Sequence, residues 1–117
     1  MRGNDDETMR IYRAVSQEEL DDIASFGGFR SAPGQMETKL FATSVEDAAF
    51  FAREILYQLD HKPCTIVEVT VPQELGNRLF RFPVDGKPTV AVDPSQLDEL
   101  NATGQIHVMH SSPIPQR

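Results

Sequence analysis

Cysteine and histidine are scarce in this sequence, and their scarcity limits the sites that the chain can build. Cys64 is the single cysteine among 117 residues, which excludes an intramolecular disulfide and a zinc site made of several thiolates. There are only three histidines, and two of them, His107 and His110, would point to opposite faces of one strand. We therefore expect no metal site.

Basic residues are also few. The chain has 11 Lys and Arg against 18 Asp and Glu, a net charge of −7, and the basic residues are scattered rather than clustered. Proteins that bind nucleic acid draw much of their affinity from basic residues at the phosphates. The charge balance therefore disfavours a nucleic-acid partner and favours a protein partner with a basic surface.

Long hydrophobic runs are absent as well. No stretch approaches the roughly 18–20 apolar residues of a membrane span, and residues 1–7 lack the apolar core of a signal peptide. We therefore expect a cytoplasmic protein that is not bound to a membrane. The length suits one domain, with an acidic disordered tail at 1–8 and a single domain at 9–117, and the sequence does not indicate an oligomeric state.

Periodicity and capping signals predict strands and helices that alternate incompletely. Strands are expected at 9–15, 39–42, 64–71, 79–82, 89–92 and 105–110, and helices after Ser16, Ser44 and Asp93, the second running to about residue 60. Asp85 and Gly86 are typical of a hairpin turn between the fourth and fifth strands. Because consecutive strands adjoin there, the pattern predicts an α+β domain with a small mixed sheet or two small packed sheets.

The corner formed by Lys39–Ser44 organises this pattern. A short strand ends at Thr43 and Ser44, and the best helix in the chain starts there, with the Ser44 hydroxyl as cap and acidic residues in the first turn. Polar side chains at a helix N-terminus form a natural anion or nucleotide corner. Ordinary strand-to-helix joints have the same appearance, so both interpretations stay open.

Arg13 interrupts an apolar strand face. In the strand 9–15 it shares a face with Met9, Ile11 and Val15. If the strand is at the edge of the sheet, Arg13 reaches solvent or pairs with a carboxylate. If it is not, Arg13 lies on the floor of a cleft and binds an anionic ligand.

Two further residues have a structural and a chemical interpretation. Glu68 lies on the more polar face of the strand 64–71, where it is either solvated or lines a cleft. Cys64 follows Pro63 at the start of that strand. A small buried thiol is favoured there over a nucleophile paired with a histidine.

Several stretches within residues 9–71 occur in a familiar order. They are Ile11–Val15, a capped helix that ends at Gly27-Gly28-Phe29, and Lys39–Ser44 followed by a helix with Glu46-Asp47-Ala48 and Phe51-Ala52. This arrangement resembles the ADP-ribosyltransferase-like domains, especially the small ones of bacterial toxins. The resemblance implies NAD as cofactor and transfer of ADP-ribose to a macromolecule as activity.

The resemblance also implies roles for particular residues. In that family a first-strand Arg or His contacts NAD, a Ser or Tyr at the end of the second strand shapes the nicotinamide pocket, and a later Glu orients the ribose. Carried over, Arg13 contacts the NAD phosphates or ribose, and Thr43 and Ser44 form the pocket corner with Phe41 beside them. The positive charge and the backbone N–H groups suit the pyrophosphate.

The catalytic carboxylate is where this chain departs from the family. Gln105 stands at the opening of the last strand, where the resemblance implies Glu, so the implied catalytic set is Arg13, Ser44 and Gln105. An amide can hold a ribose hydroxyl but supplies no negative charge. Glu68 and Glu99 lie outside the motif. The chain is then either a transferase or a degenerate member that binds NAD without catalysis.

A function of another class stays open beside this one. An acidic interaction module without catalysis, of the immunity-protein or adaptor kind, agrees with the charge of −7 and the missing Glu. Arg13 paired at an edge of the sheet, together with a pocket filled by Phe41, Phe50 or Phe51, would favour that module. RNA 2′-phosphotransferase chemistry, which needs several His and Arg residues, is disfavoured.

Overall fold

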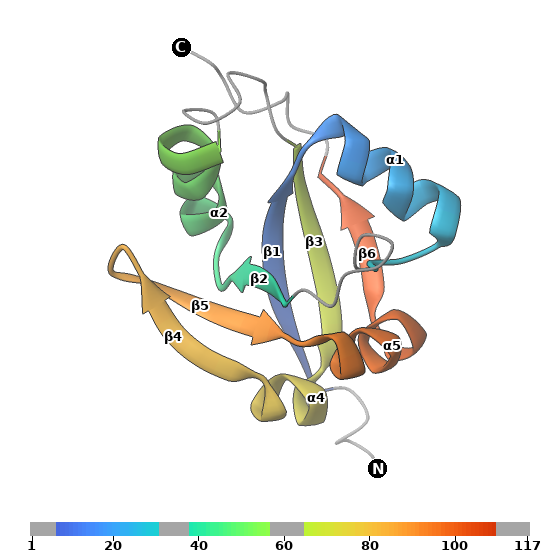
Figure 1. Cartoon of the computed structure of the whole chain (residues 1–117). Helices are drawn as coiled ribbons and strands as arrows, with labels where there is room; N and C mark the ends of the chain where they lie inside the picture. The colour runs from blue at the N-terminus through green and yellow to red at the C-terminus, as the bar shows by residue number, and fades with distance from the viewer. Residues whose placement is uncertain (1–6, 31–37, 57–64, 110–117) are drawn as a thin grey trace.

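The computed structural model describes residues 7–30, 38–56 and 65–109, and the elements in these ranges confirm an α+β domain (Figure 1). In chain order they are β1 (Thr8–Val15), α1 (Gln17–Phe26), β2 (Lys39–Ala42), α2 (Val45–Phe51), the π-helical turn η2 (Ala52–Leu56), β3 (Thr65–Pro72), α4 (Gln73–Arg78), β4 (Phe80–Val84), β5 (Lys87–Val92), α5 (Pro94–Thr103) and β6 (Gln105–Val108).

The described strands form one six-stranded sheet in the order β4-β5-β2-β1-β3-β6. All of its neighbouring pairs are antiparallel. The expectation of a mixed sheet or two packed sheets is therefore wrong in this detail. Because β1 and β2 are antiparallel, the C-terminal end of β1 and the N-terminal end of β2 lie at the same end of the sheet. The segment with α1 therefore does not form a parallel crossover.

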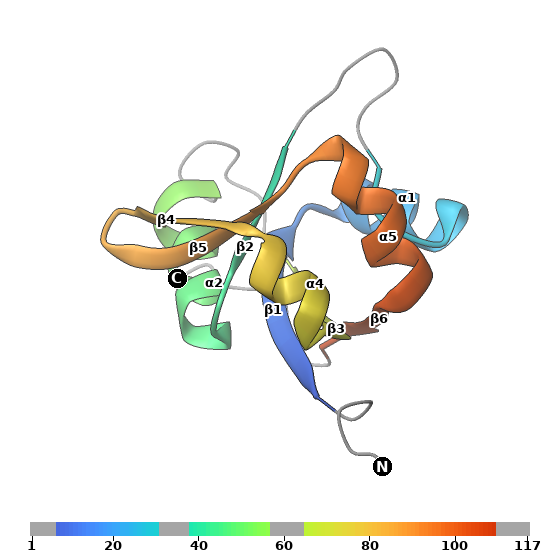
Figure 2. The same cartoon turned by 90° about the horizontal axis from the view of Figure 1, so that it is seen from below.

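The two faces of the sheet are covered unequally. Alternation places Ile11, Val67, Val69 and Val71 on one face, where they are fully buried in the main core beneath α1, α4 and α5. A smaller cluster on the other face joins Ala42, Ala48 and Ile66, with α2 as its cover. Figure 2 shows α2 on the opposite side of the sheet from α1 and α5. The hairpin β4–β5 extends beyond the cover of α2.

The predicted caps and turn are confirmed. Ser16 accepts a hydrogen bond from the Glu19 backbone N–H at the start of α1, and Asp93 and the side chain of Gln96 form a reciprocal capping box at the start of α5. Asp85 and Gly86 take positive φ values of 52° and 78°, as a tight hairpin turn requires. Local sequence therefore determines where these elements begin and reverse.

The second helix differs from the prediction. It starts at Val45 as expected, but α-helical geometry ends at Phe51 and a π-helical turn follows to Leu56. The predicted continuation to residue 60 lies outside the described residues, as do Cys64 and His110. None of the helices within the described ranges is long and apolar enough to cross a membrane.

Candidate functional site

The sheet nearly divides between β1 and β2. These strands share a single register pair, Tyr12 with Ala42, whereas β1 pairs with β3 along its whole length. Continuing that register would place Ala14 opposite Leu40, yet the two strands are not paired there. The sheet therefore consists of two three-stranded halves that separate on one side of the Tyr12–Ala42 pair.

Arg13 fills the place where the two halves separate. Its Nη1 donates to the carbonyl oxygen of Leu40 at 2.9 Å, so a side chain bridges β1 to β2 beyond the last backbone pair. Its Nε and Nη2 donate to the two carboxylate oxygens of Glu19 at 2.7 and 3.1 Å. This bidentate geometry fixes the plane of the guanidinium. The bonds leave further N–H groups of Arg13 without a partner among the described residues.

The Arg13–Glu19 pair lies mostly out of solvent. Each side chain is 22% exposed, and the Nζ of Lys39, whose side chain is only 7% exposed, lies 3.8 Å from the same Glu19 carboxylate. One carboxylate thus faces two cations at the open end of the β1–β2 gap. The pairing with a carboxylate agrees with one of the two interpretations of Arg13, but the edge location is wrong because β1 is an interior strand.

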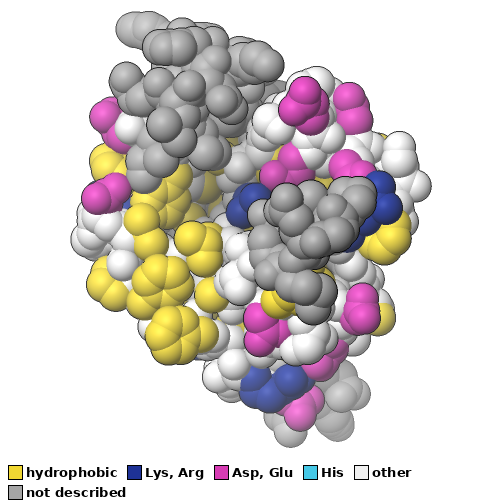
Figure 3. All heavy atoms as spheres, viewed as in Figure 1, with side chains coloured by type: hydrophobic (Ala, Val, Ile, Leu, Met, Phe, Trp, Pro, Cys, Tyr) yellow, Lys and Arg dark blue, Asp and Glu magenta, His cyan; other side chains and the backbone are white. Residues whose placement is uncertain are grey.

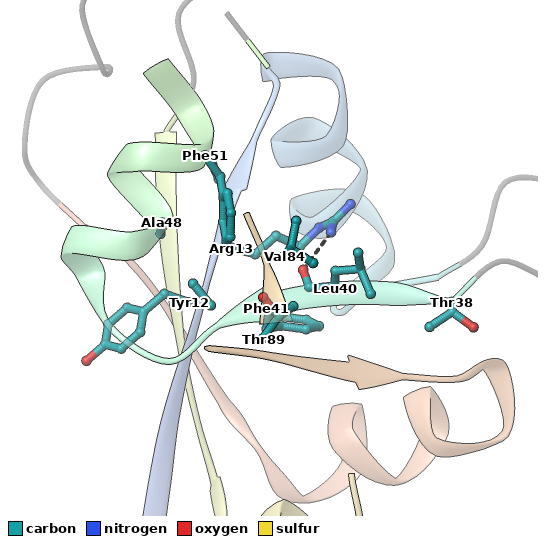
Figure 4. Close-up of a pocket in the computed structure, with 11 residues that line it drawn as sticks. Tyr12, Arg13, Thr38, Leu40, Phe41, Ala48, Phe51, Val84 and Thr89 are labelled. Atoms are coloured by element: carbon teal, nitrogen blue, oxygen red, sulfur yellow. Dashed lines mark hydrogen bonds between the residues drawn. The ribbon is translucent and has the colours of Figure 1, made fainter. Parts of the chain in front are cut away.

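A pocket of about 330 Å³ occupies the separation. Its walls are mainly apolar and come from β1, β2, α2 and the hairpin: Ala14, Leu40, Ala42, Ala48, Phe51 and Val84. Figure 4 shows Phe51 extending from α2 toward Arg13, with Val84 and Leu40 close by and the phenol of Tyr12 turned away from them. The volume and apolar lining are typical of small-molecule sites.

Phe41 lies beneath this pocket rather than inside it. The residue is 1% exposed, and its ring packs edge-on against Phe29 with centroids 5.3 Å apart. The guanidinium carbon of Arg13 lies 5.9 Å from the centroid of Phe41. Phe41 thus supports the pocket floor from the core and helps to position Arg13.

The predicted corner residues lie next to the pocket without lining it. Thr43 and Ser44 follow Ala42, the last β2 residue in the pocket wall. The Ser44 hydroxyl accepts a hydrogen bond from the Asp47 backbone N–H at 3.1 Å and so caps α2. The structure therefore brings Arg13 and Phe41 to the pocket and places Thr43 and Ser44 directly beside it.

Gln105 is not near these residues. It lies on β6, where it pairs with Thr70 of β3, and its side chain is exposed. Two strands separate β6 from β2 in the sheet. The three residues implied as catalytic, Arg13, Ser44 and Gln105, are thus not brought into one site.

Tyr12, which also lines the pocket, belongs to a polar row that crosses β1, β3 and β6. It stands opposite Glu68 on β3, and Glu68 stands opposite His107 on β6. Burial, together with the charge of Glu68 and a hydrogen bond to it, raises the pKa of the Tyr12 phenol above 10.0. Glu68 is therefore part of a cross-strand polar row, which agrees with neither a fully solvated side chain nor a pocket carboxylate.

Sequence reasoning missed Glu19 and Lys39. Ser16 and Glu19 have the spacing of a capping box, but the Glu19 side chain extends to Arg13 instead of returning to the helix N-terminus. The available signal was the single residue, Ser16, between β1 and α1, which keeps the start of the helix near the strand. An Arg on an apolar strand face needs a carboxylate, and the first turn of α1 offers two candidates, Glu18 and Glu19.

Comparisons with protein-family models, with curated proteins and with solved structures found no match to this chain. Nor does the described part of the chain hold a group of three or more His, Cys, Asp and Glu side chains that could bind a metal ion. The assignment of a function therefore depends on the pocket itself.

Proposed function

We propose that this domain binds NAD at the β1–β2 pocket, with the nicotinamide ring in the apolar interior. The observation that carries the proposal is the separation of β1 from β2, with Arg13 among the residues that line the pocket there. The resemblance to ADP-ribosyltransferase-like domains supports the proposal, because it implies that NAD is bound by the same two elements, β1 and the end of β2.

The chemistry of the pocket suits a planar ring joined to a polar sugar. Ala42, Ala48 and Phe51 offer apolar contact, while Thr89 and Arg13 add polar groups to the lining. A volume of about 330 Å³ accommodates the ring and leaves most of the dinucleotide outside. The remaining N–H groups of Arg13 can then donate to a ribose or phosphate oxygen at the mouth.

Arg13 plays a restricted part in this proposal. Its bonds to Glu19 and to the Leu40 carbonyl hold the guanidinium in place before the ligand arrives. Binding therefore does not incur the entropic cost of ordering this side chain. The same bonds offset its charge, which weakens its attraction to a pyrophosphate. We therefore expect modest affinity, with a Kd on the order of 0.1–1 mM.

Binding without transfer is the form of the function that we favour. No Asp or Glu is among the described residues that line the pocket, and Gln105 lies on β6. An oxocarbenium-like transition state is stabilised by nearby negative charge. We propose that this binding takes place in the cytoplasm.

Calorimetric titration of NAD into the wild type, Arg13→Ala and Arg10→Ala tests the proposal. Arg10 is the matched control because it lies on the same strand and is exposed on the opposite face. We expect Arg13→Ala to weaken binding about tenfold and Arg10→Ala to change it less than about twofold. No heat from the wild type at millimolar NAD would contradict the proposal.

A second variant guards against loss of folding. Ala48→Leu extends a side chain from α2 into the pocket and leaves the Arg13–Glu19 pair intact. Circular dichroism establishes that each variant is folded. We expect Ala48→Leu to abolish NAD binding while the fold persists. Release of nicotinamide during the titration would instead show that the domain is a catalyst.

A further inference from the structure

The face of the sheet beyond α2 carries an exposed aromatic surface. Register places Phe80 of β4, Ala91 of β5 and Leu40 of β2 in one cross-strand row, so their side chains share a face. Phe80 is 68% exposed and Leu40 is 39% exposed. Phe82 follows two residues after Phe80 on this face, and the two rings lie 5.5 Å apart at an angle of 31°.

This surface is hollowed into a groove. Phe80, Phe82, Leu40 and Ala91 line it, and Arg78 and Asp93 stand at its polar end. Figure 3 shows hydrophobic side chains gathered over α2 and the β4–β5 hairpin on the neighbouring part of the molecule. Among the described residues no helix packs over the Phe80–Leu40 row, because α2 packs with Ala42 and Ile66 instead.

Two charged side chains line the groove, the cation Arg78 and the anion Asp93. Arg78 donates to the Glu99 carboxylate, so its charge is already paired. Asp93 receives hydrogen bonds from the Ser95 hydroxyl and the Gln96 backbone, which lower its pKa. Arg78, Glu99 and Asp93 together leave one net negative charge at the polar end of the groove, within a chain of net charge −7.

The negative charge of the protein favours some binding partners for this groove over others. A second copy of a chain of charge −7 would be repelled, as would a nucleic acid or an anionic membrane. A protein segment that combines an apolar side chain with Lys or Arg satisfies both the exposed rings and the acidic rim. We propose that this groove docks a basic segment of a partner protein, anchored by an apolar side chain placed between Phe80 and Leu40.

A pair of exposed phenylalanines allows a matched test. Phe80→Ser removes the anchor site, whereas Phe26→Ser alters a residue that is 52% exposed on α1, outside the groove. Both positions are exposed, so neither change should unfold the domain. The probe is a fluorescent synthetic peptide of alternating Lys and Phe, with two analogues, one with Glu in place of Lys and one with Ser in place of Phe.

Fluorescence anisotropy of the ligand-free protein then decides the proposal. We expect the Lys-Phe peptide to bind the wild type, Phe80→Ser to weaken it about tenfold or more, and Phe26→Ser to change it less than about twofold. Neither analogue should bind, and salt should weaken the interaction. Equal loss in both variants, equal binding of the Glu analogue, or no binding of the Lys-Phe peptide would overturn the proposal.

Sedimentation of the same proteins tests the remaining alternative, in which a second copy of the chain occupies the groove. A wild type that forms dimers which Phe80→Ser dissociates would assign the groove to a second copy and overturn the basic partner. We expect a monomer in both cases, because the net charge opposes self-association. The outcome does not depend on NAD, since no nucleotide is present in either experiment.

Discussion

Arg13 shows how one side chain can hold two halves of a sheet together. Its three hydrogen bonds join β1 to the helix through Glu19 and to β2 through the Leu40 carbonyl. A charged group on a core face is tolerated only when its hydrogen bonds are satisfied, and Glu19 does this. The residue that the sequence marks as anomalous is therefore structural first, and the role that we propose for it in NAD binding would build on these contacts.

We expect Glu19→Ala to lower the free energy of unfolding by about 2 kcal/mol, because it leaves two mostly buried cations, Arg13 and Lys39, without this carboxylate. Urea denaturation measures the change. The neighbouring Glu18 is exposed, and Glu18→Ala should alter stability by less than about 0.5 kcal/mol. Equal effects of the two substitutions would show that the ion pair contributes nothing specific.

Tyr12 offers a second test at this scale. Its pKa lies above 10.0, first because of burial and then because of Glu68. In a Tyr57→Phe background, which leaves one tyrosine, absorbance should show Tyr12 titrating above pH 10.0, and Glu68→Gln should lower the midpoint only partly, since burial remains. A midpoint unchanged by Glu68→Gln would contradict the assigned contribution of the carboxylate.

The sign of the pH dependence follows from the same shift. Because folding raises the pKa of Tyr12, the folded state holds the phenolic proton more tightly than the unfolded state does. The associated stability is fully present below pH 10.0 and is lost as the pH rises through the folded pKa. Substitution by Phe should remove that part of the alkaline loss.

At the scale of elements, the sequence predicts the caps and the turn correctly but not which strands pair with one another. The caps at Ser16, Ser44 and Asp93 and the turn at Asp85 depend on residues a few positions apart, so the sequence reveals them. The order β4-β5-β2-β1-β3-β6 depends on contacts between distant segments, which no local pattern encodes. The interior place of β1 and the distance of Gln105 from β2 could not be predicted for that reason.

Substitutions at Ser44 test its role as the cap of α2. Ser44→Ala removes the bond to the Asp47 N–H and should cost about 1 kcal/mol of stability, whereas Ser44→Asp keeps an acceptor at the cap and should be near neutral. Chemical denaturation measures both variants. If Ser44→Ala proved as stable as the wild type, the hydroxyl would not be needed as a cap.

At the scale of the whole molecule, uneven cover creates both candidate surfaces. Three helices bury one face of the sheet, while α2 alone covers part of the other. The pocket opens where α2 meets the separation of β1 and β2, and the aromatic groove lies where the cover of α2 stops. Leu40 contributes to both, so ligand and partner binding would meet on β2.

The pocket draws its walls from β1, β2, α2 and the hairpin, so mapping NAD onto the intact domain tests the central claim most directly. Titration of NAD into isotope-labelled protein, followed by amide chemical shifts, locates the ligand. We predict saturable shifts at Ala14, Leu40, Ala48 and Phe51, and none on β6, where Gln105 lies. Absence of shifts at millimolar NAD, or shifts centred on β6, would contradict the account.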